Sequence, residues 1–228
     1  MNKQLLLTLT VLIGTLSLQA QDSLPPFKPF QHYINRESMF EKSPTQPGAI
    51  IFLGNSITNN WEWAEFFAPS NGAKILNRGI GGDVTAGVLH RLDEVARHTP
   101  SKIFLMIGIN DLNGQHSNEE IVQNIDRIIT TLQKSCPQTK LYLQSILPVN
   151  KEIFKQSSTV QSSDNIRAIN AELAKVAQKR GIPYIDLFSL MLDPNTDMLY
   201  ASYTTDGIHL TATAYLKWIK EITPLVNK

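Results

Sequence analysis

Ile103-Phe104-Leu105-Met106-Ile107 is an unbroken apolar run, and the polar turn Gly108-Ile109-Asn110-Asp111 follows it directly. A strand that is apolar on both faces is typical of a parallel sheet with helices on both sides. Other apolar, β-rich runs lie at 49–53, 74–77, 140–146 and 183–187. The sequence therefore predicts a parallel sheet in which the strand over 102–107 lies centrally.

Amphipathic segments alternate with these strands. Apolar residues recur at helical spacing over 121–132, after a Ser-x-x-Glu capping box at 117–120, and again over 166–176 and 215–222. Shorter helices are predicted over 36–41, 57–67 and 84–98. Alternating strands and helices predict an α/β domain whose sheet lies between two layers of helices.

The composition is that of an ordinary globular protein. The chain has 228 residues, of which 42% are hydrophobic and 18% charged, and its formal net charge is +1. This length suits one domain with a sizeable core, predicted over 49–228 after a proline-bearing lead segment over 21–48. A nearly neutral chain offers no basic surface, so no nucleic-acid partner is expected. Because no zinc-type or calcium-loop spacing occurs, no metal site is expected either.

The first twenty residues have the pattern of a secretory signal peptide. Lys3 precedes an uncharged run over 5–18, and Ala20 supplies a small residue at the expected cleavage site. The run is shorter than the roughly 20 residues that span a bilayer, so we expect a periplasmic or secreted protein without a stable membrane anchor. Cys136 is the only cysteine, and a structural role is expected for it.

Ser56 closes the first apolar run, in the segment Gly54-Asn55-Ser56-Ile57-Thr58. A serine hydroxyl is a poor nucleophile unless a base lies within hydrogen-bonding distance. Ser56 can equally be the N-cap of the helix predicted over 57–67. The two roles are compatible, because a helix start directs backbone N–H groups and a favourable dipole at a developing oxyanion. The segment lacks the second glycine of the G-x-S-x-G elbow, which disfavours the common α/β-hydrolase fold.

His209 is the candidate general base, because it alone among the histidines has a carboxylate three residues earlier, in Asp206-Gly207-Ile208-His209. In one tight turn Asp206 can accept a hydrogen bond from one ring nitrogen, and the other nitrogen then faces outward toward Ser56. The alternative is a turn that only leads into the last helix. The histidines to which no catalytic role is assigned are His32, His90, His98 and His116.

The glycine-rich segment Gly79-Ile80-Gly81-Gly82-Asp83 follows a predicted strand and precedes a helix, for which Asp83 is a candidate N-cap. A phosphate loop is the competing interpretation, but the third glycine and the Lys-Ser/Thr pair of nucleotide-binding loops are missing. Asn110 follows another strand, as an amide donor or as a turn residue. Ligands of such sheets bind beyond the carboxyl ends of the strands, so Ser56, Gly82 and Asn110 are expected at one edge.

These four blocks together resemble those of the SGNH hydrolases, also called GDSL-type esterases. That family is named for a serine, a glycine, an asparagine and a histidine, which match Ser56, Gly82, Asn110 and His209. The likeness spans about residues 49–220. It implies a three-layer α/β/α sandwich around a five-stranded parallel sheet, the flavodoxin-like arrangement, and no cofactor.

The resemblance also implies a role for each site residue. Ser56 is expected to be the nucleophile and His209 the general acid and base, while Asp206 orients His209. The oxyanion hole is expected to use the backbone N–H groups of Ser56 and Gly82 with the side chain of Asn110. These residues make up the predicted catalytic site.

One position departs from the family pattern, since Asn55 stands where an aspartate usually precedes the nucleophile. Hydrogen bonding beneath the serine turn is therefore expected to differ. The lead-in and the glycine segment look most like the subgroup of platelet-activating-factor acetylhydrolase catalytic subunits and bacterial carbohydrate O-acetylesterases. The expected export and the absence of an obvious apolar lid favour an O-acetylated glycan over a long-chain lipid as the substrate.

The expected function is that of an exported serine esterase that removes short acyl groups from a small-molecule or glycan ester through an acyl-enzyme. The alternatives are a lysophospholipase or thioesterase, and a non-catalytic glycan-binding module. Trp61 and Trp63 are expected either to pack the helix over 57–67 or to stack on a sugar. The segment 147–163 is expected to form a rim loop that shapes specificity.

Overall fold

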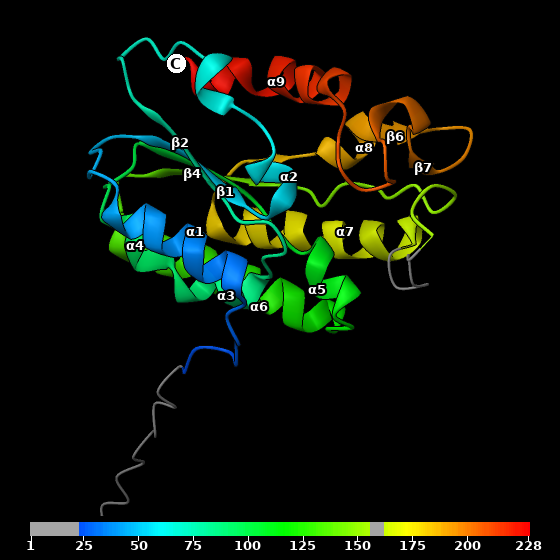
Figure 1. Cartoon of the computed structure of the whole chain (residues 1–228), viewed down its shortest axis with the longest axis horizontal. Helices are drawn as coiled ribbons and strands as arrows, with labels where there is room; N and C mark the ends of the chain where they lie inside the picture. The colour runs from blue at the N-terminus through cyan, green and yellow to red at the C-terminus, as the bar shows by residue number, and fades with distance from the viewer. Residues whose placement is uncertain (1–22, 156–161) are drawn as a thin grey trace, which may run out of the picture.

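A parallel sheet of five strands, in the order β2-β1-β3-β4-β5, forms the middle layer of the computed structural model within its described residues, 23–155 and 162–228 (Figure 1). The signal peptide predicted over 1–20 lies outside the described residues, as do residues 156–161 of the predicted rim loop. The strands are β1 (Ile50–Gly54), β2 (Ile75–Gly79), β3 (Lys102–Met106), β4 (Lys140–Gln144) and β5 (Tyr184–Ile185).

Helices cover both faces of this sheet. They are α1 (Gln31–Lys42), α2 (Ser56–Asn59), α3 (Thr85–His90), α4 (Leu92–Ala96), α5 (Ile109–Asn113), α6 (Asn118–Ser135), α7 (Ser163–Arg180), α8 (Leu187–Met191) and α9 (Ala212–Val226). Figure 1 shows α8 and α9 on one face and α1, α3, α4, α6 and α7 on the other. The predicted three-layer α/β/α sandwich is therefore confirmed, with strands in the flavodoxin-like order.

β1 and β3 form the buried centre of the sheet, as their apolar runs predict. Every residue of these two strands is buried. The register pairs Gly54 with Gly79 on one side and with Met106 on the other. The strands β2, β1 and β3 consequently end at the same level, and the segments that follow them start side by side at one edge of the sheet.

The helix predicted over 57–67 ends early, at Asn59. The side-chain amide of Asn77, in β2, donates hydrogen bonds to the carbonyl oxygens of Thr58 (3.1 Å) and Trp61 (2.9 Å). These carbonyl groups are thereby used by a side chain instead of by a continuing helix. Only a short 3₁₀ turn, η1 (Trp63–Glu65), follows in the chain. α2 is therefore a single helical turn that comes directly after β1 in the sequence.

The helix predicted over 84–98 is divided into α3 and α4 at Arg91, whose guanidinium group turns into the protein. Arg91 forms a buried ion pair with Asp83 (2.8 Å) and donates to the carbonyl oxygens of Gly54 (3.1 Å) and Arg78 (3.0 Å). Asp83 is therefore a partner of Arg91. The prediction that it caps the helix is wrong, because the N-cap is the next residue.

Other expectations on local structure have a mixed outcome. α1 is longer than the helix predicted over 36–41 and begins at Gln31. Trp63 is buried, and Trp61 stacks on Tyr215 with ring centroids 4.4 Å apart, so both rings pack in or against the core. The helix over 57–67 that they were predicted to pack does not form. Cys136 is buried and unpaired. Over the described ranges, no helix has the length and apolar character needed to cross a bilayer.

Candidate active site

The carboxyl ends of three neighbouring strands carry the predicted site residues. Ser56 begins α2 directly behind β1, Gly82 follows β2, and Asn110 lies in α5 behind β3. Successive strands lie on opposite sides of β1, with β2 on one side and β3 on the other. Ligands of open α/β sheets bind at such a switch point, beyond the carboxyl ends of the strands. The structure thus brings Ser56, Gly82 and Asn110 to one edge, as expected.

Ser56, His209 and Asp206 form a continuous chain of hydrogen bonds. Oγ of Ser56 lies 2.8 Å from Nε2 of His209, and Nδ1 of His209 lies 2.6 Å from Oδ2 of Asp206. Because a carboxylate can only accept, Nδ1 carries the hydrogen and Nε2 is left to accept the serine proton. The side chains of His209 and Asp206 are 38% and 49% exposed, so both are accessible from the solvent.

The Asp206 carboxylate also holds its own turn in place. Its Oδ1 accepts hydrogen bonds from the backbone N–H groups of Ile208 (3.0 Å) and His209 (2.8 Å). Burial raises the pKa of Asp206, but the hydrogen bonds from the His209 ring and from these two N–H groups outweigh burial and bring the pKa below its usual range. Asp206 is therefore ionised wherever a neutral histidine can act as a base.

Gly207 lets this turn pack against the segment that follows β4. Its φ of +91° favours glycine, and a Cβ atom there would lie 2.5 Å from the backbone nitrogen of Phe154 and 2.6 Å from the carbonyl oxygen of Asn150. The backbone N–H of Asn150 donates to the carbonyl oxygen of Gly207 (2.8 Å). The described part of the predicted rim loop therefore supports the turn that carries His209.

The serine turn is capped by the residue before the serine. Asn55 is the N-cap of α2, and its Oδ1 accepts from the backbone N–H of Ile57 (3.0 Å). The prediction that Ser56 itself caps the helix is thus wrong, and its hydroxyl is available to His209. The side chain of Asn55 is buried. A neutral amide supplies this cap without the cost of burying a charge.

The three predicted oxyanion donors belong to the segments that follow β1, β2 and β3. The N–H of Ser56 opens a helix and has no helical acceptor. Gly82 occupies a turn closed by a hydrogen bond from Asp83 N–H to the Ile80 carbonyl (3.1 Å), with φ of +81° at Gly82. One hydrogen of the Asn110 amide donates to the Asp83 carbonyl (2.9 Å), which fixes the amide and leaves its second hydrogen for a ligand.

The buried carboxylate of Asp111 helps to hold the segments that carry Gly82 and Asn110 in place. Asp111, next to Asn110, accepts hydrogen bonds from the backbone N–H (3.0 Å) and the hydroxyl of Thr85, and Thr85 in turn accepts from Asn124 (2.9 Å). Burial raises the pKa of Asp111 to about 6, against the opposing effect of the Thr85 hydrogen bonds. The hydrogen bonds from Thr85 to Asp111 thereby connect the segment that follows β2 with the segment that follows β3. They help to fix the positions of Gly82 and Asn110 relative to each other.

Sequence reasoning missed two residues beside the site, Phe30 and His32, because neither lies in a recognisable motif. The lead segment places the ring of Phe30 against Gly82 and the imidazole of His32 against Gly81. Arg91 was also missed, since a lone arginine in a helical segment carries no signal of an inward turn. The signal in the sequence is that Arg91 lies on the otherwise apolar face of the amphipathic segment 84–98.

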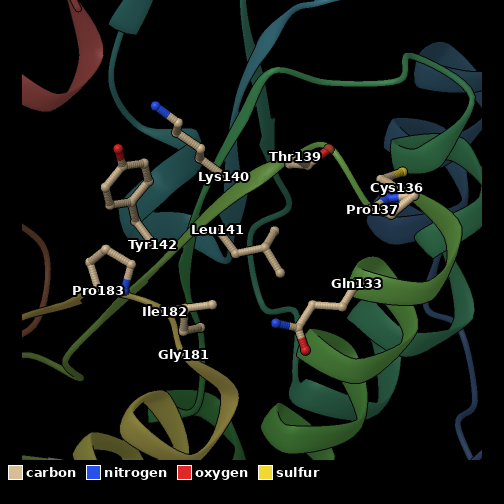
Figure 2. Close-up of a pocket in the computed structure, with 10 residues that line it drawn as sticks. All are labelled: Gln133, Cys136, Pro137, Thr139, Lys140, Leu141, Tyr142, Gly181, Ile182 and Pro183. Atoms are coloured by element: carbon tan, nitrogen blue, oxygen red, sulfur yellow. The ribbon is translucent and has the colours of Figure 1, made fainter.

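Four cavities of about 210–450 Å³ among the described residues are lined by none of the predicted site residues. A cleft of about 410 Å³ (Figure 2) contains Lys140 and Pro183, which stand at the amino ends of β4 and β5, the edge opposite the site. A cavity beside the serine turn, lined in part by Asn55, Ile57 and Ile109, measures only about 10 Å³. Among residues 23–155 and 162–228, no cluster of three metal-ligating side chains occurs.

Comparison with known proteins identifies relatives of the whole domain. The family model described as GDSL-like Lipase/Acylhydrolase matches residues 52–217. Subunit alpha2 of platelet-activating factor acetylhydrolase IB from Homo sapiens is 26% identical over 189 residues, which cover 78% of this chain and 75% of the relative. The Bos taurus subunit matches equally well.

Solved structures agree with these relatives. A Streptococcus pneumoniae structure described as a platelet activating factor is 30% identical, with a TM-score of 0.74, over 85% of this chain and 90% of that one. A Bacteroides fragilis acylhydrolase is 26% identical, with a TM-score of 0.70, over 86% of this chain and 95% of that one. An acetylxylan esterase from Geobacillus stearothermophilus, 14% identical with a TM-score of 0.64 over 80% and 95%, shares the fold.

Gly207→Ala is expected to lower kcat/KM for p-nitrophenyl acetate by roughly 100-fold, because the added Cβ displaces the turn that carries His209 and displacements near 1 Å have effects of that order. The matched control is Gly181→Ala, where φ is +67° but nothing lies within 4 Å of the added Cβ. Backbone strain alone then costs about 1–2 kcal/mol of stability. Equal kinetics in the two variants would contradict the role of Gly207.

Proposed function

The chain belongs to the GDSL-like lipase/acylhydrolase family, and from this premise we propose that it is a serine esterase in which Ser56 forms an acyl-enzyme. Ester hydrolysis is the activity of the family. The observation that carries the serine mechanism is the short contact of Ser56 Oγ with Nε2 of His209, whose Nδ1 is held by Asp206.

The reaction proceeds in two halves. Oγ of Ser56 attacks the ester carbonyl carbon while Nε2 of His209 takes the serine proton, and Asp206 stabilises the imidazolium. The negative charge on the carbonyl oxygen is met by the N–H groups of Ser56 and Gly82 and by the Asn110 amide. His209 then gives its proton to the alcohol oxygen, which leaves. In the second half His209 takes a proton from water while the water oxygen attacks the acyl carbon. The bond between this carbon and Ser56 Oγ then breaks, the acid leaves, and His209 returns the proton to Oγ.

Ser56→Ala is expected to lower kcat for p-nitrophenyl acetate by about 10⁴–10⁶-fold, and Asn110→Ala by about 10²–10³-fold, since the first removes the nucleophile and the second one oxyanion donor. Steady-state kinetics with circular dichroism as a folding check measures both. Ser135→Ala, an exposed serine at the far end of α6, is the matched control. Wild-type rates in Ser56→Ala would refute the mechanism.

We further propose that the substrate carries a short acyl group, acetyl above all, on a carbohydrate. The relatives named as acetylhydrolases support acetyl. The exposed position of His209 and Asp206 suits an alcohol part that stays in solvent. In this proposal Ser56 takes up a short acyl group, and the carbohydrate to which it is attached remains at the solvent-exposed surface.

The acyl preference is tested with p-nitrophenyl esters of increasing chain length. We expect kcat/KM to fall at least about 100-fold from acetate to octanoate, because a site that fits a short acyl group loses about 10-fold or more for a poorly accommodated methylene group. Acetate release from acetylated xylose and sialic acid derivatives is measured in parallel. A preference for octanoate, a lysophospholipid or a thioester would favour the alternative acyl hydrolases instead.

We also propose that the protein is exported. The support is the pattern of the first twenty residues, with Lys3, an uncharged run over 5–18 and Ala20. N-terminal sequencing of the protein recovered from the periplasm or the medium is expected to begin at Gln21. Recovery of the uncleaved chain in the cytoplasm would contradict export.

A further inference from the structure

The segment before the sheet forms a wall beside the active site. α1 and Phe30 precede residue 52, where the match to the family model begins. Figure 1 shows α1 on the same side of the sheet as α3 and α4. The residues that α1 brings to the site therefore lie outside the part of the chain that the family model matches.

α1 is fixed to the glycine segment by its buried side. The hydroxyl of Tyr33 donates to the carbonyl oxygen of Gly87 in α3 (2.9 Å), and Tyr33 and Phe40 are 1% and 6% exposed. Both rings share a small apolar cluster with Ile80, the residue just before Gly81. The position of α1 relative to the Gly81–Gly82 backbone is thus set by packing.

His32 and Ser56 border the same small space. A Cβ atom added to Gly81 would lie 3.4 Å from Nε2 of His32 and 4.0 Å from Cβ of Ser56. His32 stands one residue before the anchored Tyr33, and its side chain is exposed. The space that Gly81 leaves open is therefore lined by the proposed nucleophile on one side and by an exposed imidazole on the other.

Phe30 continues this wall over the next glycine. A Cβ atom added to Gly82 would lie 3.1 Å from Cζ of Phe30. The Phe30 side chain is 38% exposed, although it sits beside a buried cluster. An exposed aromatic ring thus lies against Gly82, the proposed oxyanion donor, and an exposed imidazole lies against the neighbouring Gly81.

We propose that His32 and Phe30 form the subsite for the alcohol part of the ester, in which Nε2 of His32 exchanges a hydrogen bond with a sugar hydroxyl and the Phe30 ring packs against the sugar's C–H groups. This inference rests on the proposed short-acyl activity. An acetyl group offers no polar atom beyond its carbonyl, so a polar side chain at this distance can address only the alcohol. An imidazole suits a hydroxyl, because it can donate or accept.

The subsite is tested by the ratio of two kcat/KM values, for an acetylated methyl xyloside and for p-nitrophenyl acetate, whose alcohol has no additional hydroxyl. His32→Ala is expected to lower this ratio about tenfold, through a higher KM for the sugar ester, since one hydrogen bond is lost. His32→Gln, which keeps a donor and an acceptor, is expected to restore part of it. Asn35→Ala, an exposed residue of the same helix, is the matched control.

Binding provides a readout that does not depend on turnover. Calorimetry with the acetylated methyl xyloside on Ser56→Ala and on Ser56→Ala/His32→Ala is expected to give a Kd about tenfold higher for the double variant. Equal Kd values, or equal kinetic losses on both esters, would overturn the subsite. If the wild type cleaved neither ester while Ser56→Ala still bound the sugar through His32, the proposed function would fail and the subsite would stand.

Discussion

The geometry of the site depends on the hydrogen bonds and the ion pair that the buried guanidinium group of Arg91 forms. This group binds the carbonyl oxygens of Gly54 and Arg78, where β1 and β2 end, and pairs with Asp83 at the end of the glycine segment. Burial raises the pKa of Asp83 to about 6, against the opposing effect of the Arg91 guanidinium group. Loss of either partner leaves an uncompensated buried charge, so the serine turn and the glycine segment are held together strongly.

Short side-chain-to-backbone hydrogen bonds complete this framework. Asn55 caps the serine turn, Asn110 is fixed on the Asp83 carbonyl, and Asp206 closes the turn that carries His209. Each of these turns is therefore locally rigid before a substrate arrives. Donors that are already in place need no reorganisation when charge develops, which is the main physical source of oxyanion stabilisation.

The strands and the Asp206–His209 turn were predictable, because apolar runs and an acid three residues before a base depend on local sequence. The full extents of α2, α3 and α4 were not, because Asn77 and Arg91 end or divide these helices through contacts with distant strands. The position of the lead segment could likewise not be predicted from the local sequence. Its place beside Gly81 depends on the packing of Tyr33 and Phe40 against Ile80, which no spacing in the sequence encodes.

The central claim is that Ser56 is a nucleophile activated by His209. Incubation of the folded protein with a fluorophosphonate, followed by peptide mass spectrometry, tests it most directly. The account predicts a single phosphonylated residue, Ser56, with labelling that His209→Ala slows strongly and heat denaturation abolishes. Absence of label on the folded wild-type protein, or label on a serine other than Ser56, would contradict it.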